Sequence, residues 1–299
     1  MGCRADDYFL DKNVSTAPLH EVSFTNDYFI AVFELTEGQV LSVITNSAVK
    51  SAGGSLSSTS YKMRFTNELY RYQRPINMTD VFSRYNVAKW PWEPKKGAFA
   101  SNTGTFVGNL RMLTGEVGFD HPTESFWEYA CRAGTESTFN SGLNTADTSH
   151  MNAISRNVLN SNCNHTNYDP PSSVEAMWSP DDGATAIVGS YAPNAWGLYD
   201  MHGNMMEWCL DHYSADPTGY EGYTSVDPWG PQYDNTGVSY EVATENNGRL
   251  HHVGRGGAFW YSAQYNTSSS RANYYTNNSN TSYGGVRLCI TVFDEVCVR

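Results

Sequence analysis

The residues best suited to redox or metal chemistry in this 299-residue chain are its cysteines, and their spacing argues against both. No two of them form a Cys-x-x-Cys pair, so a zinc ribbon or a thioredoxin-type site is disfavoured. Three lie in apolar contexts, at positions 131, 209 and 289, and are predicted to be buried free thiols. The six cysteines are Cys3, Cys131, Cys163, Cys209, Cys289 and Cys297.

A second kind of chemistry, adaptable binding, is indicated by the segment Tyr261–Tyr283, which reads YSAQYNTSSSRANYYTNNSNTSY. Of its 23 residues, 19 are Tyr, Asn, Ser or Thr, and Arg271 is the only charged residue. Disordered segments are usually rich in charge and poor in aromatic residues. Tyr with Ser and Asn is instead the composition of antibody paratopes. A disordered loop, an enzyme pocket and a binding surface remain open, and the composition favours the binding surface.

Within this segment the tyrosines are the expected anchors, because each buries a ring and keeps a hydroxyl for hydrogen bonding. The Asn and Ser side chains are the expected adaptable polar contacts. For any single Tyr, the alternative is a packing residue at the solvent edge. The candidate ligand-binding residues are Tyr261, Ser262, Tyr265, Asn266, Ser268, Asn273, Tyr274, Tyr275, Asn277, Asn278, Asn280 and Tyr283.

The elements that must position these residues are predicted from periodicity and caps. Alternation in DYFIAVFELT predicts a mostly buried strand, and Thr36 caps a helix over EGQVLSVI. PTESFWEYACRAG is a second helix, which Pro122 and Thr123 open and Gly134 ends. HHVGRGGAF and GGVRLCITV predict two closing strands around the polar segment. Their glycines allow tight turns at its boundaries, and Arg255 and Arg287 are expected to brace the fold from outside it. Residues 95–120 and 134–185 are expected to be irregular.

Composition bounds the class of protein. The net charge is −12, so sequence-independent binding to nucleic acid or to an anionic membrane is disfavoured. The sequence contains no run of about 18 apolar residues, so no transmembrane helix is predicted, and no signal peptide is visible. A lipid-bearing Cys3 is a minor alternative. Residues 1–20 are predicted to be an N-terminal arm, and residues 21–299 a single domain.

Five segments, taken in order, resemble the formylglycine-generating enzyme, or sulfatase-modifying factor, family. They are YFIAVFELTEGQV, HPTESFWEYACRAGT, VGSYAPNAWGLYDMHGNMMEWCLDHY, VGRGGAF and GGVRLCI. The resemblance implies an α+β protein with a C-type lectin fold of the formylglycine-generating-enzyme type. We therefore expect a loop-rich chain with small antiparallel sheets and two main helices.

The resemblance also implies where catalytic residues would lie. The enzymes carry a copper-binding cysteine pair just after the RGG strand, and alignment of that motif places Tyr261 and Asn266 at the two positions. Neither residue supplies the soft thiolate that Cu(I) prefers. A related iron-dependent branch uses a histidine set, which the adjacent His251 and His252, with His202 elsewhere, do not reproduce. The chain is predicted not to be an enzyme; the alternative is a diverged oxidase.

A lectin-type scaffold with such a segment resembles the variable proteins of diversity-generating retroelements. In that class, mutagenic reverse transcription at adenines changes Asn-type codons chiefly to those of Asn, Tyr, Ser, Thr and similar residues. The resemblance implies a variable region at about 260–283 that recognises macromolecular surfaces, such as receptors on host or other cells. The carrier is expected to be a phage or virus particle or a prokaryotic cell surface. A glycan-binding lectin is a further alternative, disfavoured because the segment has no carboxylate.

No cofactor is required by this interpretation, but a structural calcium ion is a secondary hypothesis. The resembled enzymes hold calcium in the turn that matches YDMHGNMMEW. Two carboxylates and two backbone carbonyls would serve as hard oxygen ligands. The alternative is that the two carboxylates brace the turn by hydrogen bonding. The implied ligands are Asp200, Gly203, Met205 and Glu207.

Overall fold

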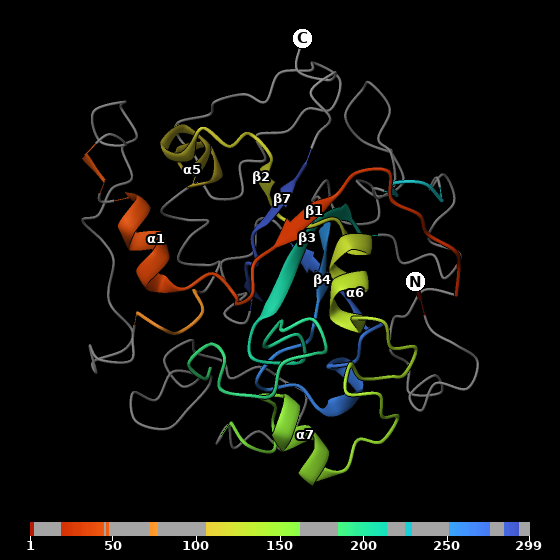
Figure 1. Cartoon of the computed structure of the whole chain (residues 1–299). Helices are drawn as coiled ribbons and strands as arrows, with labels where there is room; N and C mark the ends of the chain where they lie inside the picture. The colour runs from red at the N-terminus through yellow and green to blue at the C-terminus, as the bar shows by residue number, and fades with distance from the viewer. Residues whose placement is uncertain are drawn as a thin grey trace.

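The computed structural model describes residues 1–2, 19–44, 46–47, 72–76, 106–161, 185–213, 225–228, 251–275 and 284–292. These residues form short helices and two small sheets (Figure 1), which confirms the predicted α+β class. The elements in chain order are β1 (Tyr28–Ile30), α1 (Glu37–Ile44), α5 (Phe106–Thr114), β2 (Phe119–Asp120), α6 (Glu124–Arg132), α7 (Thr148–Ile154), β3 (Met206–His212), β4 (His251–Arg255), the 3-10 turn η4 (Ala263–Tyr265), β5 (Arg271–Tyr275), β6 (Gly284–Gly285) and β7 (Cys289–Thr291).

The two sheets join segments that are far apart in the chain. In the first sheet β7 lies between β1 and β2, so that Ile290 pairs with Phe29 on one side and Phe119 on the other. In the second sheet the strand order is β5-β4-β3-β6. All pairings are antiparallel except that of β3 with β6, which is parallel. The predicted small antiparallel sheets are present, with β6 as the exception.

Both predicted helices begin where their caps indicate. At the start of α1, the Gln39 N–H donates to Thr36 Oγ1 at 3.3 Å and Gln39 Oε1 accepts the Thr36 N–H at 2.9 Å, which is a capping box. At the start of α6, Thr123 Oγ1 accepts the Phe126 N–H at 3.2 Å. The helix ends at Ala133, which adopts a left-handed conformation with φ of 45° just before the predicted glycine.

Two further helices, α5 and α7, lie where the sequence predicts irregular chain. Helix α5 buries Phe106 and Val107 in the core. Helix α7 is capped by Asp147, whose Oδ1 accepts the His150 N–H at 2.9 Å, and it buries Met151. The described residues therefore contain four α-helices rather than two, and none of these is long and apolar enough to cross a membrane.

The prediction of a mostly buried strand after Asp27 is wrong. Strand β1 has only three residues, and Phe29, Val32 and Phe33 are 67%, 45% and 39% exposed. The chain then turns Glu34 and Leu35 into the interior. The reason is that only one face of β1 packs on the interior, whereas Phe29 lies on the face that meets solvent.

The core places α6 against β3 and β4 (Figure 1). Trp127 of α6 packs with Cys209 and Val253 of the two strands, and its side chain is 0% exposed. On the other side of the sheet, Trp208 belongs to a second cluster with Phe106 and the helices α1 and α5. This arrangement fixes the end of β4, from which the polar segment emerges.

The start of the chain also packs against α6. The Gly2 N–H donates to Glu128 Oε1 at 2.8 Å, and the Gly2 carbonyl accepts from Arg132 Nη2 at 2.8 Å. Residues 3–18 of the predicted N-terminal arm lie outside the described residues.

Candidate binding surface

The polar segment leaves β4 through two consecutive glycines with positive φ. Gly256 has φ of 85° and Gly257 has φ of 73°, a region in which side chains are strained. A Cβ atom on Gly257 would lie 1.9 Å from Asn266 Oδ1 and 2.6 Å from the Tyr265 carbonyl oxygen. Glycine is therefore required at 257, in agreement with the tight turn predicted at this boundary.

Three of the predicted contact residues lie together on the turn that follows. The Trp260 and Tyr261 rings stack with centroids 4.4 Å apart, and Tyr265 follows Tyr261 at 5.4 Å. Ser262 begins the 3-10 turn η4 between the two tyrosines. All four residues are partly buried, and Tyr261 also packs against the core cluster of Trp208. Tyr261, Ser262 and Tyr265 thus form a partly exposed aromatic turn.

Two other predicted contact residues, Asn266 and Ser268, are completely buried. Asn266 Oδ1 accepts the Ala258 N–H at 3.1 Å, and the Asn266 carbonyl accepts from His202 Nδ1 at 2.7 Å. The Ser268 N–H donates to the Thr138 carbonyl at 3.0 Å. In this structure both residues brace the segment from within and do not lie on its surface.

The Arg255 side chain holds the buried part of the segment through main-chain carbonyl groups of that segment. Its Nη1 donates to the Ser270 carbonyl at 2.6 Å and to the Ser268 carbonyl at 3.2 Å. Its Nε lies 3.2 Å from Glu124 Oε1, and its Nη2 pairs with Glu128. Burial alone would raise the pKa of the Glu128 carboxyl, but the Arg255 charge helps to lower it below its usual value. The sequence-based expectation that Arg255 braces the fold is met.

Arg271, the single charge in the polar segment, is also part of this buried network. Its Nε and Nη2 bind the two Glu124 oxygens at 2.6 Å and 2.9 Å, a bidentate pair. Glu124 and Glu128 were not predicted as its partners. The signal was available, because these glutamates are four residues apart on a helix that also carries the buried Trp127, so they share a face turned inward.

The remaining predicted contact residues divide into two groups. Asn273, Tyr274 and Tyr275 lie on β5, whose backbone pairs antiparallel with β4. The other four lie outside the described residues; they are Asn277, Asn278, Asn280 and Tyr283.

Comparison with known proteins establishes the family. Residues 1–292 match the model of the sulfatase-modifying factor enzyme 1-like domain. The chain belongs to this family. The formylglycine-generating enzyme of Streptomyces coelicolor is 36% identical over 115 residues, which are 37% of this chain and 31% of that enzyme. The similarity therefore spans less than a third of that relative's length.

Two solved structures are similar over nearly the whole chain. Treponema denticola variable protein 1 has a TM-score of 0.54 and 20% identity, and the match covers 93% of this chain and 89% of that one. PvdO from Pseudomonas aeruginosa has a TM-score of 0.61 and 19% identity, with 98% and 90% covered. At these identities the likeness shows the fold alone, and it confirms the C-type lectin fold of the formylglycine-generating-enzyme type.

One of the two carboxylates predicted to hold calcium already has a cationic partner. The Glu207 carboxylate accepts from Arg287 Nε and Nη2 at 2.6–3.0 Å and from Trp127 Nε1 at 2.6 Å. Asp200 Oδ2 accepts the Gly189 N–H at 2.6 Å. A guanidinium already neutralises one of the two carboxylates. Among the described residues, no three His, Cys, Asp or Glu side chains are grouped to hold a metal ion.

Glu207 instead anchors Arg287, the second arginine predicted to brace the fold. Arg287 Nη1 donates to the Ala31 carbonyl and its Nη2 to the Tyr199 carbonyl, each at 2.8 Å. Burial raises the pKa of the nearby Asp200 carboxyl to about 6, against a weaker lowering by the Gly189 hydrogen bond and the Arg287 charge. The turn around Asp200 and Glu207 is thus held by an arginine.

The described thiols are poorly suited to nucleophilic or soft-metal chemistry. Cys131, Cys209 and Cys289 are free and buried, as predicted from their apolar contexts. Burial raises the pKa of the Cys131 thiol to about 12, and it also raises the pKa values of the other two. The aligned copper positions are occupied by the partly buried Tyr261 and the buried Asn266.

His202 is used as a structural residue. Its Nδ1 donates to the Asn266 carbonyl, and its Nε2 accepts the Asn140 N–H at 3.1 Å, so both ring nitrogens are occupied. Burial lowers the pKa of His202 to about 4, which keeps the ring neutral at physiological pH. The sequence places His202 in the turn YDMHGNMMEW but does not indicate its contact with the polar segment.

Proposed function

We propose that this chain is a non-catalytic binding protein that presents the segment 261–283 to macromolecular targets. The observation that supports the proposal is that buried side chains of the scaffold hold this segment by its main-chain atoms. Arg255 binds its main chain at Ser268 and Ser270, and His202 binds it at Asn266. Contacts to main-chain atoms leave the identity of partly exposed side chains free to differ without loss of the fold.

The exposed side of the turn has suitable chemistry for recognition. Tyr261 and Tyr265 offer rigid amphipathic rings, and Ser262 offers a small polar group between them. Tyr and Ser together adapt to many protein surfaces at low cost in conformational entropy. The proposed target is therefore a protein or other macromolecular surface, such as a receptor on a host cell.

The fold-level likeness to Treponema denticola variable protein 1 supports the further proposal that the segment is diversified by a retroelement. On this proposal the chain is displayed on a phage or virus particle or on a prokaryotic cell surface. The buried Asn266 and Ser268 are proposed as part of the frame, and Tyr261, Ser262 and Tyr265 as contact residues.

A diverged enzyme is the second candidate, and it is favoured by one observation. The chain is 36% identical to a formylglycine-generating enzyme over 115 residues. This candidate predicts copper binding, or turnover of a cysteine-containing peptide, by the purified chain. Either result would remove the proposal of a purely binding role.

The decisive test is to sequence the DNA around the gene. A near-copy of the codons for residues 255–290, beside a reverse transcriptase gene, is expected to differ from the gene only where the copy carries adenines. The differing codons should include those for Tyr261 and Tyr265. The absence of any such copy, or differences scattered without regard to adenine, would contradict diversification.

A further inference from the structure

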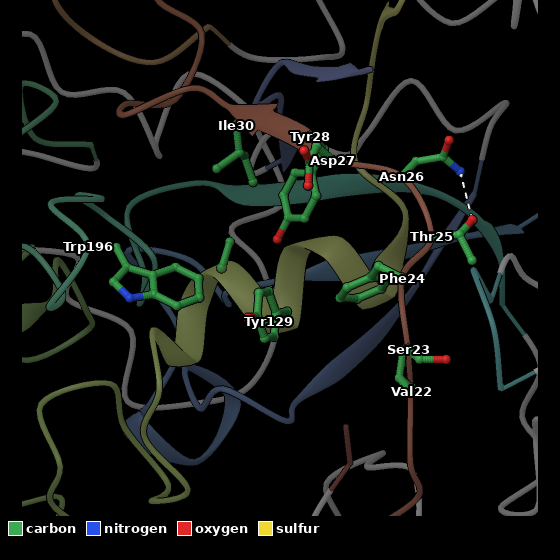
Figure 2. A pocket seen from close by; sticks show the side chains of 11 residues that line it. Val22, Ser23, Phe24, Thr25, Asn26, Asp27, Tyr28, Ile30, Tyr129 and Trp196 are labelled. Atoms are coloured by element: carbon green, nitrogen blue, oxygen red, sulfur yellow. Dashed lines mark hydrogen bonds between the residues drawn. The ribbon is translucent and has the colours of Figure 1, made fainter. Parts of the chain in front are cut away.

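A pocket of about 570 Å³ lies beside α6 (Figure 2). Tyr129 and Ala130 line it from α6, whereas Glu124 and Glu128 face Arg255. The volume is within the range of small-molecule sites, about 300–1,000 Å³. None of the predicted contact residues lines this pocket, so an inference about it is independent of the proposed function.

Aromatic rings from three separate segments form the walls. The Tyr129 and Trp196 centroids are 5.0 Å apart with the rings inclined at 63°, and Phe24 lies 5.4 Å from Tyr129 at 71°. Figure 2 shows Tyr28 above Tyr129, with Trp196 to the left and Phe24 to the right. Tyr129 and Trp196 are 52% and 49% exposed. Steeply inclined, half-exposed rings make a cage and not a flat platform.

The polar groups of the pocket favour a cation. Its lining contains the exposed Asp27 and no Lys, Arg or His. The Asp27 carboxylate has no hydrogen bond or ion pair with another described residue. A second carboxylate, Asp227, lies behind the wall, where it binds Thr25. Tyr28 Oη donates to the Phe126 carbonyl at 3.0 Å, so Tyr28 presents its ring to the pocket and has its hydroxyl occupied.

We propose that this pocket binds a quaternary alkylammonium group, as carried by choline. The negative faces of aromatic rings attract a cation within about 6 Å of their centroids, and methylated ammonium ions suit such cages because their surface is apolar. A nearby carboxylate adds charge complementarity without a requirement for an N–H donor. A sugar is less well matched, because the inclined walls offer no broad flat face for a sugar ring to stack on.

The first experiment titrates the full chain with choline and with 3,3-dimethylbutan-1-ol, its neutral isostere, and follows binding by NMR and calorimetry. Choline is expected to bind in the millimolar range or tighter, and the isostere about tenfold more weakly. Phosphocholine, tested in parallel, distinguishes the free cation from a headgroup. Equal affinity for choline and the isostere, or binding of a methyl glycoside in place of choline, would overturn the proposal, as would no binding of choline.

Variants locate the site. Trp196→Ala is expected to weaken choline binding about tenfold, and Asp27→Asn a few-fold. The matched controls are Phe29→Ala, which removes a 67% exposed ring outside the pocket, and Glu21→Gln, which removes one exposed negative charge outside it. Both controls should bind choline as the wild type does. If a control loses as much affinity as its partner variant, the assigned site is wrong. Circular dichroism checks that each variant is folded.

Discussion

The two halves of one polar stretch, residues 261–265 and 266–270, are similar in composition and opposite in environment. The first half, YSAQY, is partly buried throughout and places its rings side by side. The second half, NTSSS, is at most 5% exposed at every position. Both halves consist mainly of Tyr, Asn, Ser and Thr, so hydrophobicity does not account for the difference.

The difference lies in which partners the scaffold offers to the main chain. In the second half, Arg255, His202 and Thr138 meet the backbone polar groups of the segment. A buried polar segment is tolerated when its N–H and C=O groups are paired, and costly when they are not. The buried half, residues 266–270, therefore serves as a frame for residues 261–265, even though both have the composition of a contact surface.

The largest expected loss of stability that bears on this comparison is that of Arg255→Met. The substitution removes the guanidinium that joins Glu124, Glu128 and the carbonyls of the frame. It leaves buried carboxylates without their partner, for which the expected loss of unfolding free energy is about 3–5 kcal/mol. Urea denaturation followed by circular dichroism measures it.

The matched control is Arg132→Met, because Arg132 also pairs with Glu128 but its side chain is 16% exposed, against 0% for Arg255. Its expected loss is about 1 kcal/mol. If both variants lose the same stability, Arg255 does not hold the frame in the way the geometry indicates. If Arg255→Met does not fold at all, Arg255→Lys, which keeps the charge, should fold with an intermediate loss.

The next test is Gly257→Ala, which acts on the entry to the segment. The new Cβ would meet Asn266 Oδ1 and the Tyr265 carbonyl, and φ is 73°. The expected loss is about 3 kcal/mol, of which 1–2 kcal/mol is the left-handed conformation itself. Gly142→Ala isolates that part, because Gly142 has φ of 83° with nothing within 4 Å of its Cβ. Equal losses of unfolding free energy, measured by thermal unfolding, would mean that Asn266 and Tyr265 move to relieve the clash.

A smaller test compares one side chain from each half. Asn266→Ala leaves the buried Ala258 N–H without its acceptor, at a cost of about 1–3 kcal/mol. Ser262→Ala removes a partly exposed hydroxyl that makes no capping hydrogen bond, and should change stability by about 0.5 kcal/mol or less. Denaturant midpoints measured on both variants check the difference. A reversed order would break the distinction between frame and contact residues.

Much of the fold could be predicted because its signals are local. Thr36 and Thr123 mark the starts of α1 and α6, since a cap depends on residues only three positions away. Helices α5 and α7 were missed because both are short and are stabilised by burial of Phe106 and Met151 in separate clusters. Tertiary packing overrides weak local propensity in this way.

The site was only partly predictable for the same reason. The boundary glycines and Arg255 were identified, because a turn and a flanking charge are visible in the sequence. The burial of Asn266 was not, because it depends on partners such as His202, 64 residues away. The Glu124–Arg271 pair spans 147 residues. Composition alone cannot distinguish a polar residue that faces solvent from one that meets a distant partner.

A pH dependence of the frame is also expected, and the variant His202→Gln measures it. The folded state holds His202 neutral with a pKa of about 4, below the usual 6.5, because burial disfavours the charged form. As pH falls through 6.5 the unfolded chain takes up a proton that the folded chain does not, so wild-type stability falls between pH 6.5 and 4. From pH 7.5 to 5.5 the His202 contribution is about 1 kcal/mol.

The variant lacks this group and keeps every other titrating side chain, including the buried Asp200, whose raised pKa acts in the opposite direction. At pH 7.5 the variant should be less stable than the wild type, because Gln does not reproduce both hydrogen bonds of the ring. At pH 5.5 the gap should narrow by about 1 kcal/mol. A gap that stays constant in urea titrations would show that His202 is not held neutral against Asn266, and that the buried half is more open than its contacts indicate.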